Sequence, residues 1–156
     1  MKVLIVNTSE KTGGAALAAN RLKDALNNNG VKAKMLVRDK LTDDITVVGL
    51  SHTLRNQLHF LWERWTIFWH LHFSRKHLFE IDIANSGVDI TKLPEFKEAD
   101  IIHLSWINQG MLSLKGIRKI LDSGKPVVWT MHDIWPATGI CHITLNLSLI
   151  HISEPT

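Results

Sequence analysis

KVLIVNTSEKTGGAALAAN, residues 2–20, begins with a short apolar run and breaks at Gly13-Gly14 before an alanine-rich segment. This order predicts a buried strand, a glycine loop and the first turns of a helix. Such a loop presents free backbone N–H groups and the positive end of the helix dipole, and the absent side chains let a phosphate approach closely. The spacing matches neither G-x-G-x-x-G nor a P-loop, so a tight turn before a packed helix is the alternative interpretation.

The rest of the chain alternates predicted strands with predicted helices. Helices are expected over 15–29, with Gly30 at the position of a C′ glycine, and over 113–123. This alternation predicts an α/β fold with a parallel sheet, in which ligands bind beyond the carboxyl ends of the strands. The apolar face of the first helix is expected to be Ala15, Ala18, Leu22, Ala25 and Leu26, and the further strands are expected at 31–38, 45–50, 101–104 and 126–130.

A long amphipathic helix is predicted over 51–79, where leucine and aromatic residues recur at alternating spacings of four and three. Charged residues and histidines interrupt it, so its longest nearly apolar piece is far shorter than the roughly 20 residues of a membrane span. Two interpretations stay open: the stripe packs on its own domain, or it lies on a membrane or holds a lipid-linked substrate. The stripe consists of Leu54, Leu58, Leu61, Trp65 and Phe68, widened by Trp62 and Trp69.

Length, charge and cysteine content restrict the class of protein. A chain of 156 residues is one domain with room for a buried core, but it is small for an enzyme that holds two substrates between lobes. The net charge of +3 comes from scattered basic residues and does not indicate nucleic-acid binding. A single cysteine, Cys141, excludes an intrachain disulfide. With no cationic, cleavable leader, the chain is expected to be cytoplasmic, or peripheral to the inner face of the membrane if the tryptophan-rich helix binds lipid.

Polar and aromatic residues follow two of the predicted strands. Trp106 and Asn108 come just after one strand, and His132 and Asp133 come just after the last. Tryptophan offers an apolar face to a sugar ring, while asparagine and histidine offer donors and acceptors to hydroxyl groups, which suits a carbohydrate. His132, at a strand end beside a carboxylate, is therefore the main candidate for a functional residue.

The remaining histidines and the cysteine give weaker signals. His103 lies within a strand, where a core histidine is a more frequent outcome than a ligand contact. His132, Asp133 and Cys141-His142 could also be metal ligands, but adjacent residues rarely converge on one ion and no C-x-x-C pair exists. No metal site is therefore predicted.

Three segments together carry a resemblance to a known family: KVLIVNT with Gly13-Gly14, DIIHLSWIN (100–108) and GKPVVWTMHDIW (124–135). In combination they resemble the N-terminal half of a glycosyltransferase of family 4, which has the two-lobed GT-B architecture. The resemblance spans residues 1 to about 142. It implies a Rossmann-like parallel sheet and a retaining, hexosyltransferase-type transfer from a nucleotide sugar to a cell-surface glycan or lipid-linked acceptor, with no catalytic metal and no cofactor.

The resemblance also implies roles for single residues. Gly13 and Gly14 correspond to the loop near the donor diphosphate, and His132 corresponds to the catalytic-site histidine that contacts the donor sugar, with Asp133 beside it in the donor site. The N-terminal lobe of such enzymes mainly binds the acceptor. The implied partners are the nucleotide-sugar donor, the acceptor and a second lobe, with peripheral membrane contact left open and no nucleic acid. The acceptor-binding candidates are Trp106 and Asn108.

Two departures from the family limit what is expected of the chain. The second lobe, which holds most of the nucleotide site in the family, is absent, and no cysteine-rich stretch follows His142. Residues 1–144 are expected to form the N-terminal domain of a truncated enzyme. Residues 145–156 resemble translated sequencing-adapter sequence and are expected to be a non-native tail. The fragment alone is expected to be inactive.

Two other classes of protein are weighed as alternatives. A non-enzymatic α/β binding or regulatory module of receiver-like size would carry an acidic cluster at the strand ends, where this chain has Asn7, Ser105 and His132. A dinucleotide-dependent oxidoreductase would carry a glycine fingerprint upstream of the acidic residue that ends the second strand, here Asp39, and that fingerprint is missing.

Overall fold

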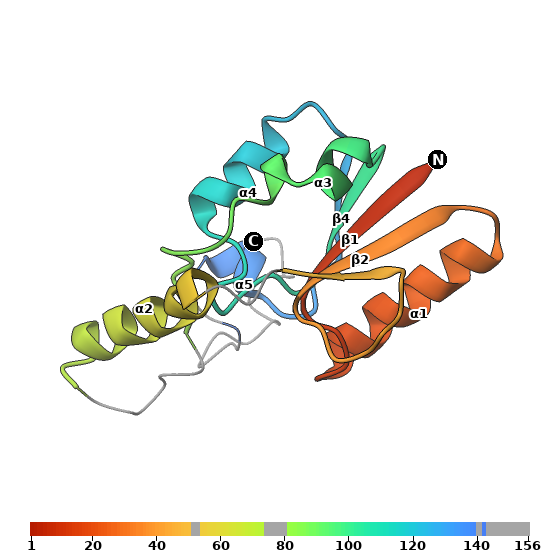
Figure 1. Ribbon diagram of the computed structural model, residues 1–156. Coiled ribbons are helices and arrows are strands. Elements are labelled where there is room, and N and C mark those ends of the chain that lie inside the picture. Colours follow the sequence, from red (N-terminus) through yellow and green to blue (C-terminus); the bar gives the residue numbers. More distant parts are fainter. Residues whose placement is uncertain (51–53, 74–80, 140–141, 143–156) are drawn as a thin grey trace, which may run out of the picture.

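The computed structural model of the protein describes residues 1–50, 54–73, 81–139 and 142 (Figure 1). Within them, five strands form one all-parallel sheet in the order β3-β2-β1-β4-β5. This is a Rossmann-like α/β fold, so the predicted parallel sheet is confirmed. The strands are β1 (Lys2–Ser9), β2 (Lys32–Asp39), β3 (Val47–Gly49), β4 (Ile101–Leu104) and β5 (Val127–Trp129).

Strand β1 lies at the centre of the sheet, between β2 and β4. Every residue from Val3 to Ser9 is buried. Its side chains alternate between two apolar clusters, with Leu4 and Val6 on one face of the sheet and Val3 and Ile5 on the other. A strand that is buried on both faces needs a continuous apolar run, which is why the sequence alone could locate it.

Helices cover both faces of the sheet (Figure 1). They are α1 (Gly14–Asn28), α2 (Leu54–His70), α3 (Pro94–Glu98), α4 (Leu114–Leu121) and α5 (Trp135–Thr138), with a 3-10 turn at Ile90–Lys92. Helix α1 contributes Ala19 to the cluster on one face, and α3 and α4 contribute Phe96 and Ile120 to the cluster on the other. Ser113 caps α4 by accepting a hydrogen bond from the N–H of Gly116, as the predicted start of that helix requires.

The face of α1 that meets the sheet is offset by one position from the predicted face. The buried residues are Ala16, Ala19 and Lys23. The two alanines have small side chains, which let the helix lie close to the strands. Lys23 can be buried because its stem is apolar and its ammonium group contacts the Asp44 carboxylate at 2.5 Å. The predicted face was wrong because it was built from alanine and leucine positions and did not include Lys23. The predicted face was Ala15, Ala18, Leu22, Ala25 and Leu26, of which Leu26 packs against the core.

The predicted apolar stripe on α2 faces outward. Residues 51–53 and 74–79 of the expected helix lie outside the described residues, and the inner face of α2 is formed by Glu63, Arg64 and Ile67, none more than 7% exposed. The interpretation that the stripe packs on its own domain is thus wrong for five of its residues, which are 53–60% exposed. These five, the outer face of α2, are Leu58, Leu61, Trp62, Trp65 and Trp69.

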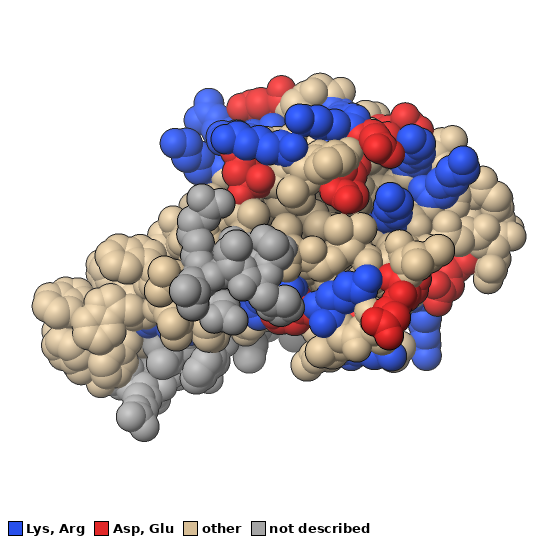
Figure 2. Space-filling model, viewed as in Figure 1, with Lys and Arg blue, Asp and Glu red and all other residues tan. Residues whose placement is uncertain are grey.

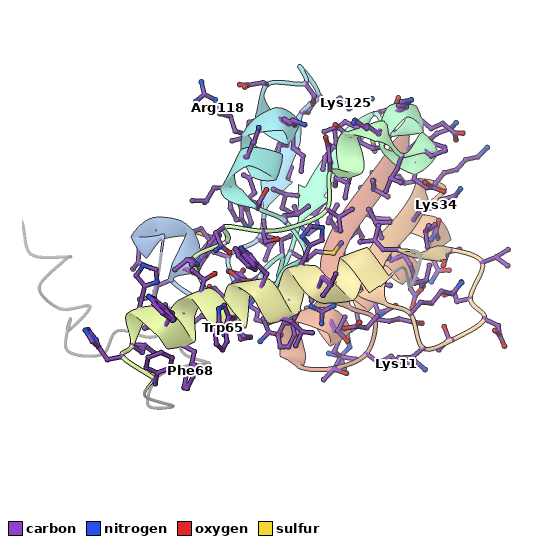
Figure 3. All side chains as sticks on the ribbon, turned by 60° about the vertical axis from the view of Figure 1, so that its left-hand side comes forward. Lys11, Lys34, Trp65, Phe68, Arg118 and Lys125 are labelled. Carbon is purple, nitrogen blue, oxygen red and sulfur yellow. The ribbon has the colours of Figure 1, made fainter. Side chains whose placement is uncertain are left out.

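The surface around α2 is poor in charge. Figure 2 shows the end of the molecule formed by this helix as almost free of Lys, Arg, Asp and Glu, in contrast to the charged surface over the sheet and its other helices. Figure 3 shows Trp65 and Phe68 along the same helix. Among the described residues, no helix is long and apolar enough to cross a membrane.

Candidate functional site: a cleft at the carboxyl edge of the sheet

A cleft of about 740 Å³ opens at the carboxyl ends of the strands. In the strand order, the chain proceeds from β1 outward to β3 on one side and then from β4 to β5 on the other, so β1 and β4 form the topological switch point where ligands bind in such folds. The ends of these two strands are tied together, since the Thr8 hydroxyl donates to the carbonyl oxygens of Trp106 and Asn108 at 3.0 and 2.9 Å.

The glycine loop and the histidine after β5 line this one cleft. Gly13, Gly14, His132 and Asp133 all contribute to its wall. The two segments that the sequence singled out therefore lie at one cleft. This follows from the parallel sheet, because segments that leave the carboxyl ends of neighbouring strands emerge at the same edge.

The two glycines serve different purposes. Gly13 is the N-cap of α1 and has a φ of +90°, a backbone conformation that residues with a side chain rarely adopt. Gly14 has no such φ, and a Cβ added to it would meet no atom within 4 Å. No side chain caps the helix, and its first turn contains no acidic residue. The positive end of α1 is thus presented to the cleft without a competing carboxylate in that turn.

His132 is an exposed side chain held at one ring nitrogen. Its Nε2 lies 2.9 Å from the hydroxyl of Ser105, which is buried at the end of β4. His103, by contrast, is 7% exposed and places Nε2 2.8 Å from the Thr130 hydroxyl. Burial, and then the neighbouring His132, lower the pKa of His103, which is the environment of a neutral core histidine.

Asp133 and Trp106 form one wall of the cleft. The indole Nε1–H of Trp106 donates to Asp133 Oδ2 at 3.1 Å, and the backbone N–H of Trp135 donates to Asp133 Oδ1 at 3.0 Å. Asn108, the other acceptor candidate, is buried and is not among the residues that line the cleft. The structure thus brings together five of the six candidate residues.

Sequence reasoning missed the contribution of the β2 end. Arg38 and Asp39 line the cleft, joined by a salt bridge of 2.6 Å, and Arg38 also donates to the carbonyl oxygen of Gln109 at 2.5 Å while its guanidinium lies 5.5 Å from the centre of the Phe60 ring. The signal was available, because these two polar residues end a strand of the same sheet, as Thr8 does near the end of β1.

The turn after β4 brings the cleft rim against α2. Gln109 and Gly110 both have positive φ, at +57° and +76°, and a Cβ added to Gly110 would lie 2.8 Å from the backbone nitrogen of Phe60. Glycine is therefore required here for close approach of two backbones as well as for its φ. The rim of the cleft rests directly on the backbone of α2.

The described residues contain no group of three or more His, Cys, Asp or Glu side chains placed to hold a metal ion. Cys141 lies outside the described residues. Of the three other residues weighed as ligands, His132, Asp133 and His142, the last two contact each other through Oδ2 and Nδ1 at 2.5 Å.

Comparison of the chain with protein-family models, with curated proteins and with solved structures gave no match. The class of the protein therefore rests on its own architecture. The five-stranded parallel sheet of order 3-2-1-4-5, with a cleft at its switch point, defines a Rossmann-like α/β protein. Any narrower assignment has to be argued from the residues that line the cleft.

Proposed function

We propose that this chain is the N-terminal, acceptor-side lobe of a retaining glycosyltransferase of the family 4 type, which transfers a sugar from a nucleotide sugar to a cell-surface glycan or a lipid-linked acceptor. The observation that carries the proposal is the single cleft shared by the Gly13-Gly14 loop and His132. A loop of free N–H groups suits a diphosphate, and a histidine beside a tryptophan suits a sugar. The two chemistries that a sugar diphosphate requires are thus found side by side.

The mechanism proposed for these residues is positioning combined with electrostatic stabilisation. Negative charge develops on the leaving diphosphate as the bond to the sugar breaks, and N–H donors fixed in advance at that position stabilise it without reorganising. The N-terminus of α1, entered through Gly13 and Gly14, supplies such donors. His132 is placed to orient the sugar, since its ring is fixed through Nε2 by Ser105.

Valine at position 14 should weaken diphosphate binding without unfolding the protein. A Cβ added there meets no protein atom within 4 Å, so Gly14→Val adds bulk at the N-terminus of α1 without a clash of its Cβ. We expect affinity for inorganic pyrophosphate, measured by titration calorimetry, to fall by at least about tenfold, while the free energy of unfolding changes by less than ~1 kcal/mol. Ala18→Val, on the exposed side of α1, is the matched control and should bind like the parent. Equal losses of binding and stability at position 14 would instead support a purely structural turn.

We further propose that the outer face of α2 contacts the membrane that carries the acceptor. Its three tryptophans and two leucines are more than half exposed, and tryptophan, with an apolar ring and one polar N–H, favours the boundary between lipid and water. In the sequence, Arg75 and Lys76 follow the helix and could attract anionic headgroups. A lipid-linked acceptor would then reach the cleft at the rim that rests on α2.

Vesicle flotation tests the membrane contact. The chain should float with vesicles that contain phosphatidylglycerol, and replacing Trp62 and Trp69 together by Gln should abolish most of the retention, because both side chains are about 60% exposed and removing them sacrifices apolar area without disturbing the core. Leu17→Gln, an exposed apolar residue of α1, is the control. Failure of the parent chain to float would remove the membrane from the proposal and leave the cleft unaffected.

A further inference from the structure

His142 is bound between two carboxylates. Its Nδ1 lies 2.5 Å from Asp133 Oδ2 and its Nε2 lies 2.6 Å from Asp82 Oδ2. The side chains of His142 and Asp82 are 11% and 2% exposed, so neither contact is a surface ion pair. No sequence pattern indicates this cluster, because Asp82 is 60 residues away from His142 and belongs to no strand end.

Each of the two contacts needs a hydrogen between nitrogen and oxygen. A neutral imidazole carries one N–H and would turn a lone pair toward one of the carboxylates, which repels. The geometry therefore fits a ring that carries an N–H toward each carboxylate. Among the described residues, Arg64 on α2 forms a salt bridge with the other oxygen of Asp82, and the Glu63 carboxylate lies 3.9 Å from Arg64.

The cluster ends in the wall of the cleft. Asp133 Oδ2 accepts from His142 and also from the indole of Trp106, whose ring centre lies 6.0 Å from that of His142. At the other end, the carbonyl oxygen of Asp82 accepts from the indole of Trp135 at 2.7 Å, which anchors the segment that carries Asp82. The orientation of Trp106 thus depends on Asp133, and that of Asp133 depends on His142.

We propose that His142 is a positioning residue that holds Asp133, and through it Trp106, in the orientation that meets the bound sugar. The consequence for ligand affinity rests on the proposed function of the cleft, whereas the orientation of Trp106 does not. The contact that matters is the one at Nδ1, because that nitrogen touches the carboxylate on the side of the cleft. The contact at Nε2 only anchors the ring to Asp82.

Two substitutions separate the contacts. In His142→Asn the amide nitrogen stands at the same number of bonds from Cβ as Nδ1, so the donor to Asp133 is kept. In His142→Gln the amide nitrogen stands where Nε2 stood, so the donor to Asp82 is kept and the donor to Asp133 is lost. The readouts are the indole N–H resonance of Trp106, assigned with Trp106→Phe, and the affinity for UDP-glucose. His70→Gln and His70→Asn, at an exposed position of α2, are the matched controls.

We expect His142→Gln to shift the Trp106 indole resonance, to speed its exchange with water and to weaken UDP-glucose binding by about tenfold. His142→Asn should stay close to the parent in all three. Equal effects of both substitutions would show a merely structural role and overturn the proposal, as would an unchanged indole resonance in both. If the parent does not bind UDP-glucose, this nucleotide sugar is not the ligand of the cleft, while the indole comparison still decides the role of His142.

A measurement on the parent protein covers the case in which both variants unfold. The Nδ1–H of His142 should be visible by NMR, exchange slowly with water, and show a nuclear Overhauser effect to the indole N–H of Trp106, because both protons point to one oxygen of Asp133. An unprotonated Nδ1 at neutral pH would overturn the proposal.

Discussion

On the function proposed above, the purified chain of 156 residues should transfer no sugar, because a two-lobed glycosyltransferase performs the transfer between its lobes. Holding donor and acceptor in the reacting geometry contributes roughly 7 to 11 kcal/mol to lowering the barrier, which corresponds to a rate factor on the order of 10⁵ to 10⁸. In the proposed enzyme, this cleft would hold only one side of such an arrangement. The expected effect is therefore a rate below detection.

Mass spectrometry of glycan and lipid acceptors, incubated with a panel of nucleotide sugars, measures the transfer. The comparison protein carries the reading frame that follows codon 144 in the genomic DNA, and its His132→Ala variant tests the cleft. We expect activity in the extended protein and none in its variant. Comparable turnover by the short chain would refute the need for a second lobe, and binding without transfer by both proteins would favour a non-enzymatic α/β binding module.

Removal of the Asp82 carboxylate should be the most destabilising single substitution on the α2 side of the molecule. Asp82 is 1% exposed and its side chain pairs with Arg64 and His142, so Asp82→Ala leaves the buried Arg64 without this carboxylate. Breaking a buried pair by removing one partner typically costs about 3 to 5 kcal/mol, a large part of the roughly 5 to 15 kcal/mol by which domains are stable.

The exposed pair of Arg118 and Asp122 provides the control. It joins the same two residue types on α4 at 3.5 Å, with both side chains at least 70% exposed, and such a pair contributes about 0.3 to 0.5 kcal/mol. Urea denaturation followed by circular dichroism gives the free energies of unfolding of Asp82→Ala and Asp122→Ala. If the two variants differ by less than about 1 kcal/mol, the buried cluster does not support the fold as described.

The sheet was predictable because its signal is local. Strands β1 and β4 are short apolar runs, and buried parallel strands need no other pattern. Strand β5 is apolar as well, although it lies at the edge of the sheet and Val128 is 52% exposed. The face of α1 was not predictable in the same way, since Lys23 is buried through its stem and its pairing with Asp44 across the chain. The stripe of α2 failed as a packing signal for a related reason. The polar pair Glu63 and Arg64 finds buried partners at Asp82 and Ala84, and the apolar residues are left outside.

The candidate site was also predictable where its signal is local and not predictable where it depends on contacts between residues distant in the sequence. Gly13, Gly14, His132 and Asp133 were found because each follows a strand, and parallel strands gather their carboxyl ends. Asp39 ends a strand as well, but the sequence was considered at this position only for the glycine fingerprint of dinucleotide-binding proteins. The cluster around His142 depends on a contact across 60 residues that no periodicity or spacing encodes. Sequence patterns thus indicated the edge of the sheet at which the cleft lies, whereas the contacts of His142 that hold Asp133 are visible only in the structure.

The turn at Gln109-Gly110 gives the molecule a stiff mechanical link. Where Gly110 meets Phe60, backbone touches backbone, with no layer of side chains between them that could change rotamer and absorb a displacement. The carbonyl oxygen of Gln109 in turn accepts a hydrogen bond from Arg38, which also lines the cleft. A displacement of helix α2 toward the sheet is therefore transmitted directly to the turn that forms the rim of the cleft.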